Sequence, residues 1–187
     1  PSYADAFSNL GNTLQSLGRS KEAELSYLQA IALRPDYAEA HNNLGVMLQE
    51  LGRLGEAEAR YKQAIELKPD YTEALSNLGV LLFEMQKYSL AAKQFELCDT
   101  HHSKLYAIKC SYLVDREVEF YEKFDLLVSQ GESNAVIGSL GFQSELKYGV
   151  KKFNPFCNDP LKYVLELNLR ENYDFENIFI NTAKGLL

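Results

Sequence analysis

Apolar residues recur every three or four positions over the first part of the chain. The first such stripe consists of Phe7, Leu10, Leu14 and Leu17. A second stripe consists of Ala23, Tyr27, Ala30 and Ile31. This spacing places the apolar side chains on one face of a helix. Gly18 lies between the stripes and predicts the end of the first helix, because glycine readily adopts a positive φ. The pattern therefore predicts a helical hairpin.

The hairpin pattern repeats with a period of 34 residues. The aligned starts are Tyr3-Ala4-Asp5-Ala6, Tyr37-Ala38-Glu39-Ala40 and Tyr71-Thr72-Glu73-Ala74. Gly52 follows Gly18 at the same interval, and Pro69 follows Pro35. Each proline predicts the end of the second helix of its hairpin, because the residue before a proline avoids the α region.

Two further recurring positions indicate how the hairpins pack. Gly11 and Gly45 are expected where the two antiparallel helices approach closely. Tyr27 and Tyr61 are expected to fill the space between units. Since a single hairpin cannot bury both of its faces, we expect the units to stack with contacts between neighbours only.

A 34-residue helix–turn–helix period with these glycine, tyrosine and proline positions resembles the tetratricopeptide repeat (TPR) family. The resemblance implies an all-α fold, a right-handed α-α superhelix in which repeats stack as a solenoid. Residues 1–102 are expected to form three units. These units are 4–37, 38–71 and 72–102. The third departs from the pattern, with Gln86, Cys98 and Ser103 in place of glycine, alanine and proline.

Residues 103–187 predict further helices without another match to the repeat. We expect a degenerate fourth hairpin over 103–131 and an aromatic-rich helical cap or linker over 132–187. The helices expected in this part are Leu105–Val114, Val118–Val128, Asn134–Tyr148, Leu161–Leu169 and Asp174–Leu187. Residues Lys151–Pro160 contain two prolines and predict a loop.

Composition limits the partners and the compartment. The 187 residues carry 19 basic and 26 acidic side chains, a net charge of −7, which disfavours nucleic acid and anionic membrane surfaces. No uncharged run approaches the roughly 20 residues of a membrane-spanning helix. Three cysteines at irregular spacing suit a reducing compartment better than a disulfide framework. We therefore expect a cytoplasmic protein with no nucleic-acid or membrane partner.

The residue types that carry catalysis are scarce. His41 lies on the first helix of the second unit, where a packing role is favoured over that of a general base. Cys98, His101, His102 and Cys110 hold zinc-type side chains, but the chain has no Cys-x-x-Cys pair. Neither a phosphate-binding loop nor a partnered nucleophile is found. The sequence therefore predicts no catalytic residue, no metal site and no cofactor.

Asparagine recurs on the first helix of each unit. Asn9, Asn43 and Asn77 each precede a leucine, and Asn12 lies one turn after Asn9. Helix propensity disfavours asparagine at such positions, and stacked amides would offer donors and acceptors to the backbone of an extended peptide. The three recurring residues resemble the asparagine ladder of the TPR arrays in O-linked N-acetylglucosamine transferases. This resemblance implies peptide contacts there, to which we add Asn12; a repeat pattern inherited without any ligand is the alternative.

The groove is expected to prefer a neutral or basic peptide. Some TPR modules clamp a C-terminal carboxylate with lysine and arginine, but here Ser8, Asn42 and Ser76 occupy the neighbouring groove positions. Acidic residues add negative charge to the same helices, at Asp5, Glu39, Glu50, Glu73 and Glu84. The clamp is therefore missing from this sequence, and an acidic ligand is electrostatically disfavoured.

The last part of the chain carries a second resemblance. It rests on Ile137-Gly138-Ser139-Leu140, Tyr148-Gly149-Val150 and the run from Asn154 to Val164. Residues 105–187 are similar to a connecting region in bacterial proteins that place TPRs before a 2-oxoglutarate/iron(II)-dependent oxygenase domain. Such oxygenases bind iron through a His-x-Asp/Glu pair and a distant histidine. His41, His101 and His102 do not begin such a pair, so any catalytic part would lie after Leu187.

Three interpretations of function stay open. The first is a non-catalytic protein-interaction module that binds an extended peptide or partner in the concave groove. The second is the N-terminal, substrate-recruiting part of a larger 2-oxoglutarate/iron(II) oxygenase, and the third is a scaffold or self-assembly module. Pro1-Ser2-Tyr3 aligns with Pro35-Asp36-Tyr37, which favours a fragment of a longer protein. Its first helices are then expected to expose an apolar edge available for self-association.

Overall fold

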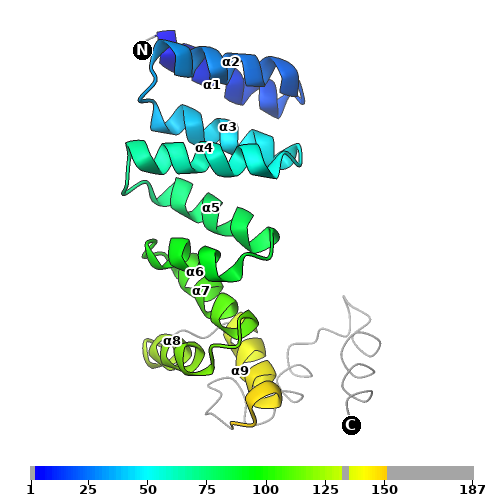
Figure 1. Cartoon of the computed structure of the whole chain (residues 1–187), viewed down its shortest axis with the longest axis vertical. Coiled ribbons are helices and arrows are strands. Elements are labelled where there is room, and N and C mark those ends of the chain that lie inside the picture. Colours follow the sequence, from blue (N-terminus) through cyan, green and yellow to red (C-terminus); the bar gives the residue numbers. More distant parts are fainter. Residues whose placement is uncertain (1–2, 132–134, 151–187) are drawn as a thin grey trace. The chain divides into compact units, whose positions relative to one another are not determined.

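The computed structural model describes residues 3–131 and 135–150, in which every regular element is a helix (Figure 1). The helices are α1 (Tyr3–Ser16), α2 (Ser20–Leu33), α3 (Ala38–Glu50), α4 (Leu54–Leu67), α5 (Thr72–Glu84), α6 (Tyr88–Glu96), α7 (His101–Leu113), α8 (Glu117–Ser129) and α9 (Ala135–Tyr148). They belong to two compact units, Pro1–Arg116 and Glu117–Leu187, with α8 and α9 in the second. The predicted all-α solenoid is confirmed.

The turns inside the first three hairpins share one backbone conformation. Gly18 and Gly52 have φ values of 72° and 74°, as their positions between helices predict. Gln86 occupies the same phase in the third unit and also adopts a positive φ, 59°. A side chain in this region costs about 1–2 kcal/mol, so the third turn keeps the shape of the other two at some cost in stability.

The prolines end the second helices as predicted. α2 ends one residue before Arg34, which precedes Pro35 and has φ −142° and ψ 89°; Lys68, before Pro69, has φ −141° and ψ 89°. Both residues lie outside the α region, as the clash with a following proline requires.

The third unit ends differently from the first two. Its second helix, α6, stops at Glu96, and α7 begins at His101 rather than at the predicted Leu105. Thr100 caps α7: its side chain accepts a hydrogen bond from the Ser103 backbone, and the Ser103 side chain accepts one from the Thr100 backbone. Ser103 stands at the phase of Pro35, so the position that ends a helix in the first unit helps to start one here.

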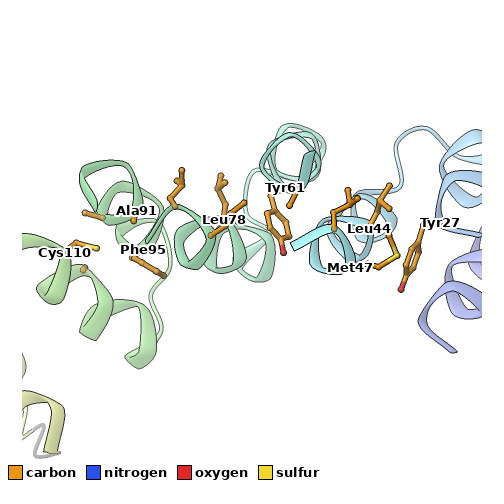
Figure 2. Close-up of a cluster of buried hydrophobic side chains, with 14 of the residues drawn as sticks. Tyr27, Leu44, Met47, Tyr61, Leu78, Ala91, Phe95 and Cys110 are labelled. Carbon is orange, nitrogen blue, oxygen red and sulfur yellow. The ribbon is translucent and has the colours of Figure 1, made fainter. Parts of the chain in front are cut away.

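Aromatic rings on the second helices lie directly on glycines of the first. A Cβ atom built on Gly11 would lie 2.6 Å from Cε1 of Tyr27, and one on Gly45 would lie 2.7 Å from Cε1 of Tyr61. Each ring therefore lies inside its own hairpin, whereas the sequence analysis placed it between units. The same rings also belong to one continuous core that extends from Leu14 to Cys110 (Figure 2).

The outer side of α1 is exposed where the later units are covered. In the second unit Ala40, Leu44 and Met47 are buried. Their equivalents Ala6, Leu10 and Thr13 are exposed, with 46% of Leu10 accessible. This matches the expected apolar edge, and self-association through it stays a prediction.

The second compact unit holds the predicted helices 118–128 and 134–148 as α8 and α9. Phe120 and Phe124 stack with ring centroids 5.5 Å apart, and Tyr148 lies 6.2 Å from the Phe120 ring. The predicted loop Lys151–Pro160 and the helices beyond it lie outside the described residues. None of the helices that the structure describes has the length and apolarity needed to cross a membrane.

Candidate functional site

The first helices of the three units, α1, α3 and α5, are neighbours and present one polar surface. We call this surface the inner face. It carries Asn12, Gln15, Asn43, Val46, Gln49, Glu50, Asn77, Val80 and Glu84. These positions follow the three- and four-residue spacing of one helix side and are linked between units by the hydrogen bonds described below.

A pocket of about 360 Å³ lies on the inner face between α3 and α5. Its lining consists of Val46, Gln49, Glu50, Tyr61, Asn77, Val80 and Glu84. The pocket thus combines two apolar side chains, two amides, a phenol and two carboxylates. Asn77 is the one predicted peptide-binding residue in this lining.

A hydrogen-bonded relay of tyrosine, glutamine and glutamate connects the first two units. The Tyr27 hydroxyl lies within donating distance of two acceptors, Asn12 Oδ1 at 2.7 Å and Gln15 Oε1 at 2.9 Å. Gln15 Nε2 donates to Glu50 Oε2 at 2.7 Å. Burial and the nearby Glu50 carboxylate raise the pKa of Tyr27 to about 12. The phenol therefore stays protonated at neutral pH and remains a donor.

The same relay recurs one unit later. Tyr61 donates to Gln49 Oε1 at 2.9 Å, and Gln49 Nε2 donates to Glu84 Oε2 at 2.8 Å. Burial, followed by the charges of Glu84, Glu50 and Glu73, raises the pKa of Tyr61 as well. Each glutamine thereby fixes a carboxylate of the following unit and leaves its charge in place.

The predicted asparagines do not form one continuous row of hydrogen-bonded amides. Asn43 Nδ2 donates to Asn12 Oδ1 at 3.2 Å, whereas Asn77 Nδ2 donates to the fully buried Asn42 at 3.0 Å. Asn9 is exposed and contributes only its backbone carbonyl, to Thr13. The structure thus brings Asn12 and Asn43 together, and Asn77 joins a residue outside the predicted set.

The partly exposed ladder amides keep some capacity for a ligand. Asn43 and Asn77 are half-buried, and each uses an amide N–H toward the preceding unit. Within the described residues their Oδ1 atoms accept no hydrogen bond. An amide oxygen without an intramolecular donor can accept a hydrogen bond from a peptide N–H. Peptide contact at these residues stays a prediction.

The relay stops in the third unit. Phe83 and Phe95 replace the glutamine and the tyrosine, and Phe83 contacts Tyr88 and Tyr106 with ring centroids 5.2 and 5.3 Å apart. Lys109 lies with its Nζ 5.0 Å from the Phe83 ring centroid. The inner face therefore changes from amides and carboxylates to an aromatic cluster along α5.

Sequence reasoning missed Gln15, Gln49 and Tyr61 as inner-face residues. A signal was present, because Gln15 and Gln49 recur at the 34-residue period and lie three residues after Asn12 and Val46. Each glutamine binds a glutamate 35 residues later, and these bonds could be predicted only by knowing how the units stack.

The side chains considered for a metal site do not converge. Cys98 and Cys110 are buried, whereas His101 and His102 are exposed. Cys98 Sγ donates to backbone carbonyls of Gln94 and Thr72. In the described ranges no group of three His, Cys, Asp or Glu side chains is arranged to hold a metal ion.

His41 is a core residue, as predicted, and 4% exposed. Its Nε2 lies 3.3 Å from the Pro35 carbonyl, which accepts the ring N–H, and its buried Nδ1 has no partner. Burial lowers the pKa of His41, and the Arg60 charge lowers it further, although the Pro35 carbonyl opposes both effects. A proton added to Nδ1 therefore has no acceptor inside the fold.

We expect His41 to make the fold less stable in mild acid. The unfolded chain protonates this histidine near pH 6.5, whereas the folded chain resists protonation, so the free energy of unfolding falls as the pH drops below about 6.5. His41→Leu, which copies the buried Leu75 of the next unit, should flatten this dependence between pH 7 and pH 5 in urea titrations. Equal slopes for the wild type and His41→Leu would contradict the assignment.

Comparisons with known proteins agree with this architecture. The TPR repeat model matches residues 15–52 and 47–86. The structure is similar to that of the MamA RS-1 ArsTM double mutant, with a TM-score of 0.75 and 17% identity over 93% of this chain and 99% of that one. It is also similar to a structure from the functional characterization of Pseudomonas aeruginosa pilF, with a TM-score of 0.69 and 27% identity over 92% and 78% of the two chains.

A third similar structure is the first TPR of Spaghetti (RPAP3) bound to the HSP90 peptide SRMEEVD, with a TM-score of 0.57 and 23% identity. It covers 60% of this chain and 96% of that one. No curated protein sequence matches the chain. Residues 15–86 therefore carry TPR repeats, which confirms the first resemblance; none of these comparisons bears on the second, to the oxygenase linker.

Proposed function

We propose that this chain is a non-catalytic protein-interaction module whose inner face binds an extended peptide segment. The observation that carries the proposal is the pocket between α3 and α5. Its lining contains the amide side chains of Gln49 and Asn77, which can donate and accept hydrogen bonds. Asn9, Asn12, Asn43 and Asn77 are the proposed peptide contacts. A peptide backbone needs alternating donors and acceptors, and primary amides provide both.

Charge favours a neutral or basic ligand. Glu73 accepts a hydrogen bond from Asn42, and Glu50 and Glu84 accept from glutamines, so uncharged amides hold all three carboxylates. The RPAP3 repeat is bound to SRMEEVD, a peptide with three acidic side chains. That peptide should bind this chain weakly, because its carboxylates would meet the carboxylates of the inner face.

A binding assay tests the asparagine contacts. The probe is a pool of immobilised random heptapeptides built from uncharged residues. Replacing Asn9, Asn12, Asn43 and Asn77 together by alanine should weaken peptide binding by up to about a thousandfold, since four net hydrogen bonds at about 1 kcal/mol each total about 4 kcal/mol. Gln29→Ala with Gln63→Ala, two exposed amides on α2 and α4, should bind like the wild type. Undiminished affinity in the fourfold variant, with an unchanged helical signal, would remove the asparagines from the proposed site.

Two other proposals remain beside this one. The exposed Leu10 edge of α1 favours a scaffold that assembles through its first unit. The sequence likeness of residues 105–187 favours the recruiting part of an oxygenase, which the coding sequence after Leu187 would test. A cytoplasmic location and a bacterial source likewise stay proposals.

A further inference from the structure

The pocket between α3 and α5 is large enough for one long side chain. Its volume of about 360 Å³ lies near the lower end of the range for ligand pockets, roughly 300–1,000 Å³. Two of its walls come from Val46 and Val80, which also pack against the core. These valines sit at the same position of consecutive units and provide apolar surface on α3 and α5.

The polar part of the pocket carries negative charge without a counterion. Glu50 and Glu84 each bind a glutamine N–H through Oε2, which orients the carboxylate and leaves Oε1 unused. Neither carboxylate pairs with a cationic side chain in the part of the chain that the structure describes. An amide donor does not neutralise a carboxylate, so both charges remain available to a ligand.

Carboxylates elsewhere in the three repeats are paired with cationic side chains. Glu58 binds Lys62 at 2.7 Å and Lys87 at 3.0 Å. Glu24 lies 2.8 Å from Arg53. Glu24 and Glu58 on the second helices thus have cationic partners, whereas the carboxylates lining the pocket are held by uncharged amides.

A side chain with an aliphatic stem and a cationic head matches this lining. Lysine and arginine bury their methylene groups against apolar surface while the charged end binds carboxylate oxygens. An aliphatic side chain would leave both carboxylates without a cationic partner, and an acidic one would be repelled by them.

We propose that this pocket binds one lysine or arginine side chain of the peptide on the inner face. Its stem lies against Val46 and Val80, and its charged end binds the free oxygens of Glu50 and Glu84. This assignment rests on the proposed function, and it specifies one residue of the ligand.

Three heptapeptide pools test the assignment. They are identical random mixtures of uncharged residues except at the fixed central position, which is lysine, norleucine or glutamate. Wild-type chain should bind the lysine pool about tenfold more tightly than the norleucine pool, the ratio expected of one charge-assisted hydrogen bond, and the glutamate pool least. Added salt should reduce the preference for lysine, because Glu50 and Glu84 are exposed to solvent and their charges are screened by salt.

Glu50→Gln with Glu84→Gln should abolish the preference for lysine while norleucine binding persists. A matched control, Asp36→Asn with Glu66→Gln, removes the same charge at exposed positions outside the pocket and should keep the preference. Equal retention of the lysine and norleucine pools by the wild type would overturn the assignment and leave groove binding intact. Retention of no pool would reject both proposals, and a preference that survives in Glu50→Gln/Glu84→Gln would place the cation elsewhere.

Discussion

Tyr61→Ala is expected to lower the free energy of unfolding by about 3–5 kcal/mol, the range for deleting a buried aromatic ring. Tyr61 is 1% exposed and is among the largest side chains of the core. Its ring lies on Gly45 of the same hairpin and belongs to the core shared with the neighbouring units. Removal therefore opens a cavity in the core beside the pocket between α3 and α5, and the core contacts of the ring are lost. Urea titration followed by circular dichroism measures the loss.

Tyr61→Phe separates the ring from its hydroxyl. This variant keeps the packing and loses only the bond to Gln49 Oε1, so we expect a loss of about 1 kcal/mol. The third unit already carries Phe95 at this position, with 1% exposure. If Tyr61→Ala and Tyr61→Phe destabilised the chain equally, the hydroxyl rather than the ring would carry the contribution.

Gly45→Ala is expected to destabilise the chain by about 1–3 kcal/mol, the usual cost of forcing an extra carbon into a packed core. The new Cβ would lie 2.7 Å from Cε1 and 2.8 Å from Cδ1 of Tyr61, closer than van der Waals contact allows. The ring is 1% exposed and packs within the shared core, so a shift large enough to relieve the overlap would disturb that packing. The overlap thus outweighs the gain of up to about 1 kcal/mol that alanine brings to a helix.

Gly55→Ala provides the matched control for that gain. Gly55 is an exposed glycine near the start of α4, and a Cβ there meets no atom within 4 Å. The same exchange should therefore leave stability unchanged or raise it by up to about 1 kcal/mol. Thermal unfolding of the two variants side by side measures the difference. If the Gly45→Ala variant were as stable as the Gly55→Ala variant, the Tyr61 ring would have moved to accommodate the added methyl group.

The period of the sequence was enough to predict the first two units in detail. Gly18 and Gly52 mark turns, and Pro35 and Pro69 mark helix ends, because each acts through its own backbone. The start of α7 was predicted four residues late, since it depends on the reciprocal bonds of Thr100 and Ser103. Threonine and serine are common in many kinds of structure, so the sequence does not mark these two as helix caps. They can cap α7 because Ser103 stands where the earlier units have a proline.

The candidate site was less predictable than the fold. Periodicity placed Asn12, Asn43 and Asn77 on the first helices and identified Glu50 and Glu84 as acidic neighbours. It did not predict which amides meet, because Asn43 reaches a residue 31 positions earlier and Asn77 one 35 positions earlier. A difference of four positions is one helical turn, and only the way the units stack selects between them.

The third unit's phenylalanines bear on how a bound strand would be aligned. An array of identical repeats has translational symmetry, so a ligand can slip by one unit and make the same contacts. Here the first unit carries Asn12 and Ser16 where the second carries Val46 and Glu50, and Phe83 replaces Gln49 in the third. Each step along the array is thus chemically distinct, so under the proposed function a peptide displaced by one unit would meet different side chains.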